Sequence, residues 1–145
     1  RRRPCSVVRA SDVRFKQSTM NMDNKSHTYA FDFDGVITQY DGFRGVEYTG
    51  EPNASVVEAI RALKRLGHKI IVHSTRGDAS LRAYCTEHDI PFDYINCNPK
   101  REGENPGKPI AYAYIDDRAV CYRGQSAEQL VEELTSFRAY WQKAE

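Results

Sequence analysis

The chain has 145 residues, which is the length of one domain of ordinary size. Its composition, 40% hydrophobic and 28% charged, is typical of a globular protein and excludes a wholly disordered chain or a fibrous repeat. The net charge is +1, but residues 1–19 hold six basic residues and one acidic residue, so the remainder carries −4. The rest of the chain therefore lacks the basic surface expected of a domain that binds nucleic acid.

Hydropathy and cysteine spacing bear on location. No apolar stretch reaches the roughly 18 residues that a membrane span needs, and no apolar signal-peptide region follows the basic start. The four cysteines lie far apart and form neither a CxxC pair nor a cluster with zinc-ligand spacing, which favours reduced thiols. We therefore expect a cytoplasmic protein with no membrane partner.

Residues 1–27 lack hydrophobic periodicity and are rich in Arg, Ser and Asn. We expect a disordered basic tail here, with a natural start near Met20 or Met22, and a globular domain over residues 28–145. The other interpretation is a basic arm that contacts phosphate groups.

The following residues alternate between strand and helix patterns. Short apolar segments predict strands at 29–33, 69–73, 92–95 and 111–115. Glycine and aromatic residues at 40–50 indicate a loop or small hairpin, and Asn, Pro and Gly indicate a loop at 96–109.

Three helices are expected between and after these strands. The first begins at a capping box formed by Ser55 and Glu58 and ends at Gly67. The second is capped by Asp78 and ends near residue 88. The third begins at Ser126, and we expect its apolar stripe to pack on the core: Leu130, Leu134, Phe137 and Trp141.

This alternation predicts an α/β domain, a three-layer Rossmann-like arrangement with a mostly parallel sheet. In such sheets, functional sites gather at the carboxyl ends of the strands. Three of the predicted strands end in polar residues: Asp32 and Asp34; Ser74, Thr75 and Arg76; Asp116, Asp117 and Arg118. Carboxylates this close together repel one another, and a divalent cation would offset that repulsion. Oxygen ligands alone favour magnesium over zinc.

A calcium loop is the other interpretation of Asp32-x-Asp34. The EF-hand pattern needs an oxygen ligand where Val36 stands, a glycine one residue later and a glutamate where Phe43 stands. It fails at all three positions.

The chain resembles the haloacid dehalogenase superfamily of phosphohydrolases over residues 28–135. Phe31-Asp-Phe-Asp-Gly-Val-Ile-Thr38 is similar to the first family motif, and Ile70-Ile-Val-His-Ser74 to the second, a hydrophobic strand that ends in Ser or Thr. Lys108 is the candidate for the third motif, and Tyr114-Ile-Asp-Asp117 is similar to the fourth.

The resemblance implies a role for each matching residue. Asp32 is implied as the nucleophile that forms an aspartyl-phosphate, and Asp34 as the acid and base. Mg²⁺ would be held by Asp32, the Asp34 backbone carbonyl and Asp117, with Asp116 as a further ligand or hydrogen-bonded to one. Ser74 and Lys108 would bind the phosphoryl oxygens.

Two positions leave alternatives open. Only residues 109–115 separate Lys108 from Asp116, so Lys108 must act from a loop, and Lys100 is the substitute. Thr75 replaces Ser74 if the strand ends one residue later, and Arg76 is a further candidate for binding substrate.

Within the family, Asp34 favours hydrolysis of phosphate esters. Neither the segment between Asp34 and Ser55 nor the loop at 96–109 is long enough for a cap domain. This implies a capless phosphatase with an open site. Such a site suits extended or bulky phosphoesters, such as nucleic-acid ends, phosphorylated glycans or phosphoproteins, and a phosphorylated small molecule is a further candidate. Alternatively, another subunit of a homo-oligomer covers the site. The competing function is a non-catalytic module that binds a phosphorylated ligand or nucleic acid through the basic arm.

Overall fold

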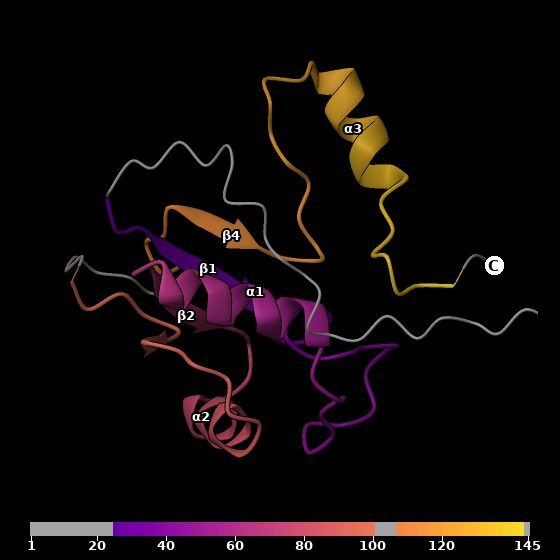
Figure 1. Ribbon diagram of the computed structural model, residues 1–145. Coiled ribbons are helices and arrows are strands. Elements are labelled where there is room, and N and C mark those ends of the chain that lie inside the picture. Colours follow the sequence, from indigo (N-terminus) through magenta and orange to yellow (C-terminus); the bar gives the residue numbers. More distant parts are fainter. Residues whose placement is uncertain (1–24, 101–106, 144–145) are drawn as a thin grey trace, which may run out of the picture.

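The computed structural model describes residues 25–100 and 107–143. Its elements in chain order are β1 (Thr28–Asp32), α1 (Ala54–Arg65), β2 (Lys69–His73), α2 (Asp78–Glu87), β3 (Tyr94–Ile95), β4 (Ala113–Ile115) and α3 (Ala127–Thr135) (Figure 1). The strands form one parallel sheet in the order β3-β2-β1-β4. The predicted α/β Rossmann-like fold is confirmed, and the described residues include no cap domain.

The core lies around the two central strands. β2 is buried at Ile70, Ile71 and Val72 because both of its faces are covered, which explains its unbroken β-branched run. The helices α1 and α2 add Ile60 and Leu81, which are fully buried against the same cluster.

The register of the sheet sets the position of the polar strand ends. Phe31 of β1 pairs with Val72 of β2 and with Ile115 of β4. Because the three strands are parallel and in register, the residues that follow them emerge at one edge of the sheet. Asp32 therefore lies beside His73, and Asp116 follows the β4 residue that pairs with Phe31.

Two of the predicted helix starts are wrong. Asn53, not Ser55, is the residue that precedes α1. Its N–H donates to the Ile37 carbonyl at 2.8 Å. Ser55 lies inside the helix, and its Oγ donates to Asn53 Oδ1. Gly77 precedes α2, so Asp78 is the first residue of this helix rather than its cap. The capping box of Ser126 with Gln129 is confirmed at the start of α3.

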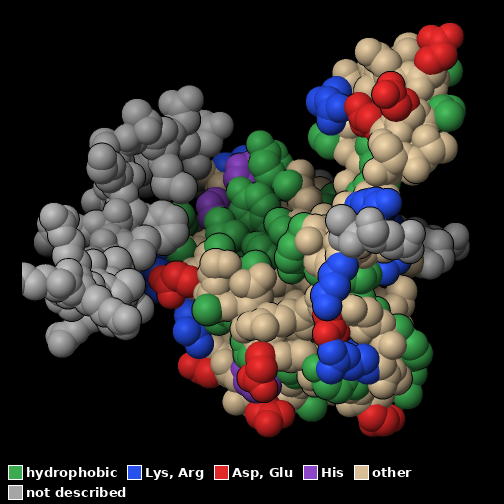
Figure 2. Space-filling model, turned by 90° about the vertical axis from the view of Figure 1, so that its right-hand side faces the viewer, with side chains coloured by type: hydrophobic (Ala, Val, Ile, Leu, Met, Phe, Trp, Pro, Cys, Tyr) green, Lys and Arg blue, Asp and Glu red, His purple; other side chains and the backbone are tan. Residues whose placement is uncertain are grey.

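The expected packing of the α3 stripe on the core is also wrong. α3 has no buried residue, and Leu134 is 56% exposed. Figure 1 shows the helix away from the sheet, and Figure 2 shows it as a lobe that stands apart from the body. Trp141 lies beyond the end of the helix and contacts the body instead.

Cys85, Cys97 and Cys121 form no disulfide within the described residues. Cys5 lies outside these residues, as does most of the predicted tail. Within the part of the chain that is described, no helix has both the length and the apolar character needed to cross a membrane.

Candidate active site

A pocket of about 920 Å³ lies at the carboxyl edge of the sheet. Its floor and walls include most of the residues that the sequence singled out: Asp32, Asp34, Ser74, Thr75, Arg76, Asp116 and Arg118. The segment 40–50, which we call the flap, contributes further lining residues: Tyr40, Phe43, Val46 and Glu47. The sequence therefore predicted the base of the pocket, and the flap completes it.

Three carboxylates form a cluster at the same edge, and two of them, Asp32 and Asp116, line the pocket. Asp32, Asp116 and Asp117 each offer an oxygen within 4.8 Å of the others. Burial raises the pKa of Asp32 to about 7; the Phe33 N–H opposes this rise, and the neighbouring charges of Asp116 and Asp117 add to it. Without a compensating positive charge, ionisation of Asp32 is therefore costly near neutral pH.

The two oxygens of Asp117 have different surroundings. Oδ2 accepts a hydrogen bond from the Trp141 indole N–H, whereas Oδ1 is buried and has no partner among the described residues. A buried carboxylate oxygen without a partner is destabilising. A hard divalent cation would satisfy it, and the all-oxygen donor set suits Mg²⁺ or Ca²⁺ better than Zn²⁺. The residues present therefore fit such an ion.

A tight loop after β1 brings Asp34 and Gly35 to the site. The Phe33 carbonyl accepts hydrogen bonds from the Thr38 N–H at 2.9 Å and the Thr38 Oγ1 at 3.2 Å. Gly35 has a φ of +83°, and a Cβ at this position would collide with the Asp117 carboxylate and lie 3.1 Å from the Trp141 indole nitrogen. Only glycine meets both requirements without strain.

The segment after α3 returns to this loop. Ala139 is buried, the Tyr140 hydroxyl donates to the Gly35 carbonyl at 2.6 Å, and the Trp141 ring packs edge-on against Tyr40 at 4.7 Å between centroids. The sequence pattern places Trp141 in a helical stripe and does not indicate this role. No local pattern could have indicated it, since the contact joins residues that are distant along the chain.

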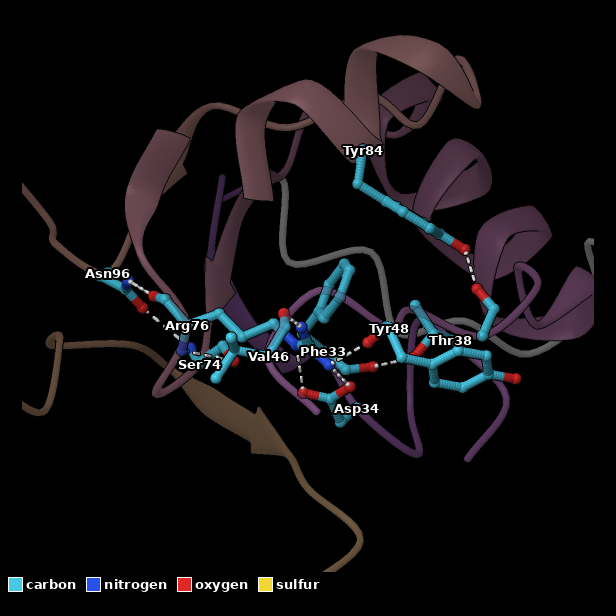
Figure 3. Close-up of polar contacts among 10 residues, drawn as sticks. Phe33, Asp34, Thr38, Val46, Tyr48, Ser74, Arg76, Tyr84 and Asn96 are labelled. Carbon is cyan, nitrogen blue, oxygen red and sulfur yellow. Dashed lines mark hydrogen bonds and ion pairs between the residues drawn. The ribbon is translucent and has the colours of Figure 1, made fainter. Parts of the chain in front are cut away.

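Asp34 does not belong to the carboxylate cluster. Its two oxygens accept hydrogen bonds from Arg76 Nε at 2.7 Å and Nη2 at 2.9 Å (Figure 3). The same guanidinium donates to the carbonyls of Val46 at 2.8 Å and Tyr48 at 2.7 Å. The hydrogen bonds with Asp34, together with its charge, raise the pKa of Arg76, so it stays charged.

The end of β2 is held by an asparagine that the sequence analysis missed. Asn96 Oδ1 accepts the Ser74 N–H at 2.8 Å, and Asn96 Nδ2 donates to Asp78 Oδ1 at 2.8 Å. Asn96 has a φ of +53°, which asparagine tolerates better than most residues. Its place directly after β3, at the same edge as the acidic residues, is the signal that could have identified it.

The predicted lysines lie outside the pocket lining. Lys108 Nζ is 4.6 Å from the centroid of the Tyr114 ring, and Lys100 is exposed. The adjacent Gly107 does line the pocket. Residues 101–106, between the two candidates, are outside the described ranges.

Comparison with known proteins supports the fold. No family model matches the chain, and no curated protein matches it either. A solved structure of a conserved protein from Bacteroides thetaiotaomicron is similar, with a TM-score of 0.54 and 26% identity. The match covers 77% of this chain and 90% of that one. No activity is given for that protein, so the similarity carries no function across.

Proposed function

We propose that this protein is a Mg²⁺-dependent phosphatase of the haloacid dehalogenase type, which hydrolyses a phosphate monoester through an aspartyl-phosphate on Asp32. The observation that carries the proposal is the cluster of Asp32, Asp116 and Asp117, in which one buried oxygen of Asp117 lacks a partner among the described residues. Two members of the cluster, Asp32 and Asp116, line an open pocket at the edge of a parallel sheet, where such folds place their sites.

Mg²⁺ would be held by Asp32, Asp117, the Asp34 backbone carbonyl and Asp116. When bound, it supplies positive charge that polarises the phosphoryl group and neutralises developing negative charge. The same charge would favour the ionised form of Asp32, the form that can attack. This requirement follows from the burial that raises the pKa of Asp32 to about 7.

The reaction has two steps on this chain's residues. The Asp32 carboxylate attacks phosphorus, the bond to the leaving oxygen breaks, and that oxygen takes a proton from Asp34. A water molecule then attacks the aspartyl-phosphate, Asp34 takes a proton from the water, and the bond between phosphorus and Asp32 breaks to release phosphate.

The contact with Arg76 bears on the first of these steps. Both oxygens of Asp34 accept hydrogen bonds from Arg76. Asp34 must therefore leave this contact to hold the proton that it passes to the leaving oxygen. We therefore expect the best substrates to have leaving groups that need little protonation.

The phosphoryl oxygens would be bound by groups at the end of β2 and by a lysine. Ser74 and Thr75 line the pocket beside Asp32, and Asn96 holds the Ser74 backbone in place. Lys108, or Lys100 in its place, would supply the remaining positive charge. The open pocket admits a small phosphoester, a phosphorylated glycan or a nucleic-acid end.

The free thiols of the described residues suit a reducing compartment. We therefore propose the cytoplasm as the location.

The test combines binding and turnover. Trp141 is the only tryptophan and donates to Asp117, so its fluorescence should change when Mg²⁺ binds. Hydrolysis of an aryl phosphate should stop with EDTA and return with Mg²⁺. Full activity after thorough chelation would overturn the mechanism. Binding of phosphate with no turnover of any ester would favour a non-catalytic module that binds phosphorylated ligands.

A further inference from the structure

The flap forms one wall of the pocket, and Arg76 joins it to the body. Its guanidinium donates to two flap carbonyls, those of Val46 and Tyr48, and to both oxygens of Asp34 (Figure 3). These four hydrogen bonds use four of the five N–H donors of an arginine. The Arg76 side chain is only 14% exposed, so it has little capacity left for a phosphoryl group.

The base of the flap is fixed independently of Arg76. The Gln39 N–H donates to the Glu51 carbonyl at 2.8 Å, and the Tyr84 hydroxyl donates to the Gly50 carbonyl at 2.7 Å. The tip depends more on Arg76, because the two carbonyls that accept from it belong to residues 46 and 48. Loss of Arg76 should therefore release the tip and leave the base in place.

The tip presents apolar side chains to the pocket. Phe43 and Val46 both line it, and they are 74% and 75% exposed. They lie in the flap, whereas the proposed nucleophile and the other carboxylates that would hold Mg²⁺ lie at the ends of β1 and β4. A phosphate ester whose phosphoryl group lies at the carboxylates would direct its leaving group into the rest of the pocket, where burial of an apolar group against these side chains is favourable.

We propose that Arg76 is a positioning residue: it holds the flap against the body so that Phe43 and Val46 form a binding wall for an apolar leaving group. The proposal rests on the proposed function for its substrate, but the attachment of the flap stands on the contacts alone. It assigns Arg76 to the flap and to Asp34 rather than to the phosphoryl group.

The first experiment measures amide hydrogen exchange and needs no activity. Arg76→Met should speed exchange of the Tyr48 N–H, which donates to the Gly45 carbonyl inside the flap, by about tenfold or more. Exchange of the Gln39 N–H at the base should change little. Arg118→Met is the matched control: Arg118 lines the same pocket, but its guanidinium lies over the Trp141 ring, so exchange at Tyr48 should stay as in the parent protein.

The second experiment separates the leaving group from the phosphoryl group. With Arg76→Met, the KM for an aryl phosphate should rise by about tenfold, whereas the inhibition constant of inorganic phosphate, which has no leaving group, should stay within about twofold. Phe43→Ala should raise the KM in the same way without faster exchange at Tyr48. Arg76→Lys should lie between the parent protein and Arg76→Met, because an ammonium cannot reproduce the forked contacts.

The outcomes separate the two proposals. Unchanged exchange at Tyr48 in Arg76→Met would overturn the positioning role. Equal losses of affinity for the aryl ester and for inorganic phosphate would also overturn it, because they would show that Arg76 binds the phosphoryl group. Faster exchange in a protein that hydrolyses no phosphate ester would keep the role in holding the flap, but it would remove both the phosphatase and the leaving-group wall.

Discussion

Replacement of the proposed nucleophile should stabilise the protein when no cation is bound. Burial, with added repulsion from Asp116 and Asp117, raises the pKa of Asp32 from its ordinary 3.8 to about 7. A carboxyl whose pKa is higher in the folded state contributes its full stability only below pH 3.8, and that contribution is lost as the pH rises toward 7. Asp32→Asn removes the cost of ionising this buried carboxyl, because the amide carries no charge at any of these pH values.

The magnitude follows from the two pKa values. A difference of this size corresponds to about 4 kcal/mol at pH 8. Asp32 is only partly buried, and solvent screening reduces the figure to about 2 kcal/mol. In EDTA at pH 8, the free energy of unfolding of Asp32→Asn should therefore be about 2 kcal/mol higher than that of the parent protein. This difference should shrink toward zero by about pH 4.

Urea denaturation from pH 4 to pH 8, with EDTA or with Mg²⁺, measures this difference. Mg²⁺ should stabilise the parent protein more than Asp32→Asn, since the variant lacks a charged ligand, and so should narrow or reverse the gap. Asp89→Asn is the control: Asp89 has a fully exposed side chain and a φ of +51°, which asparagine accepts. The reasoning is refuted if Asp32→Asn is no more stable than the parent in EDTA at pH 8, or if Asp89→Asn gains equally.

Two further substitutions test the site. Asp34→Asn should keep Mg²⁺ binding, measured by Trp141 fluorescence, but slow turnover by roughly 10²–10⁴-fold, with a smaller loss for substrates with good leaving groups; equal losses for good and poor leaving groups would contradict its role in proton transfer. Gly35→Ala should cost about 1–3 kcal/mol in urea denaturation for its positive φ, and more for the collision with Asp117. Gly67→Ala, with a φ of +85° and open space around a Cβ, isolates the first contribution, so equal losses in the two variants would show that the collision is relieved at no cost.

The parts of the fold that depend on hydrophobic pattern could be predicted from the sequence. The β2 strand over Lys69–His73 has the expected bounds, because a β-branched run of this length has few other solutions. The start of α1 could not be predicted in this way. The Ser55 pattern is a valid local signal, but the long-range bond from the Asn53 N–H to the Ile37 carbonyl sets where the helix begins.

The packing of the apolar stripe of α3 could not be predicted for a related reason. Its helical spacing is real, and the helix forms, but spacing does not specify what the apolar face contacts. Long connections on both sides of α3 place it away from the sheet (Figure 1). Periodicity therefore predicted the element but not its packing.

The cluster of Asp32, Asp116 and Asp117 could be predicted because parallel strands bring their carboxyl ends to one edge. Polar residues after β1, β2 and β4 must therefore meet there. What the sequence could not show is how each carboxylate is held. Arg76 binds Asp34 and the flap, whereas Trp141, from the end of the chain, binds Asp117. These two supports come from different elements and hold different carboxylates. A change at Arg76 should therefore alter the tip of the flap and Asp34 and leave the Asp117 side of the cation site intact. A change at Trp141 should alter Asp117 and the contact with Tyr40 in the flap, and leave the contact between Arg76 and Asp34 intact.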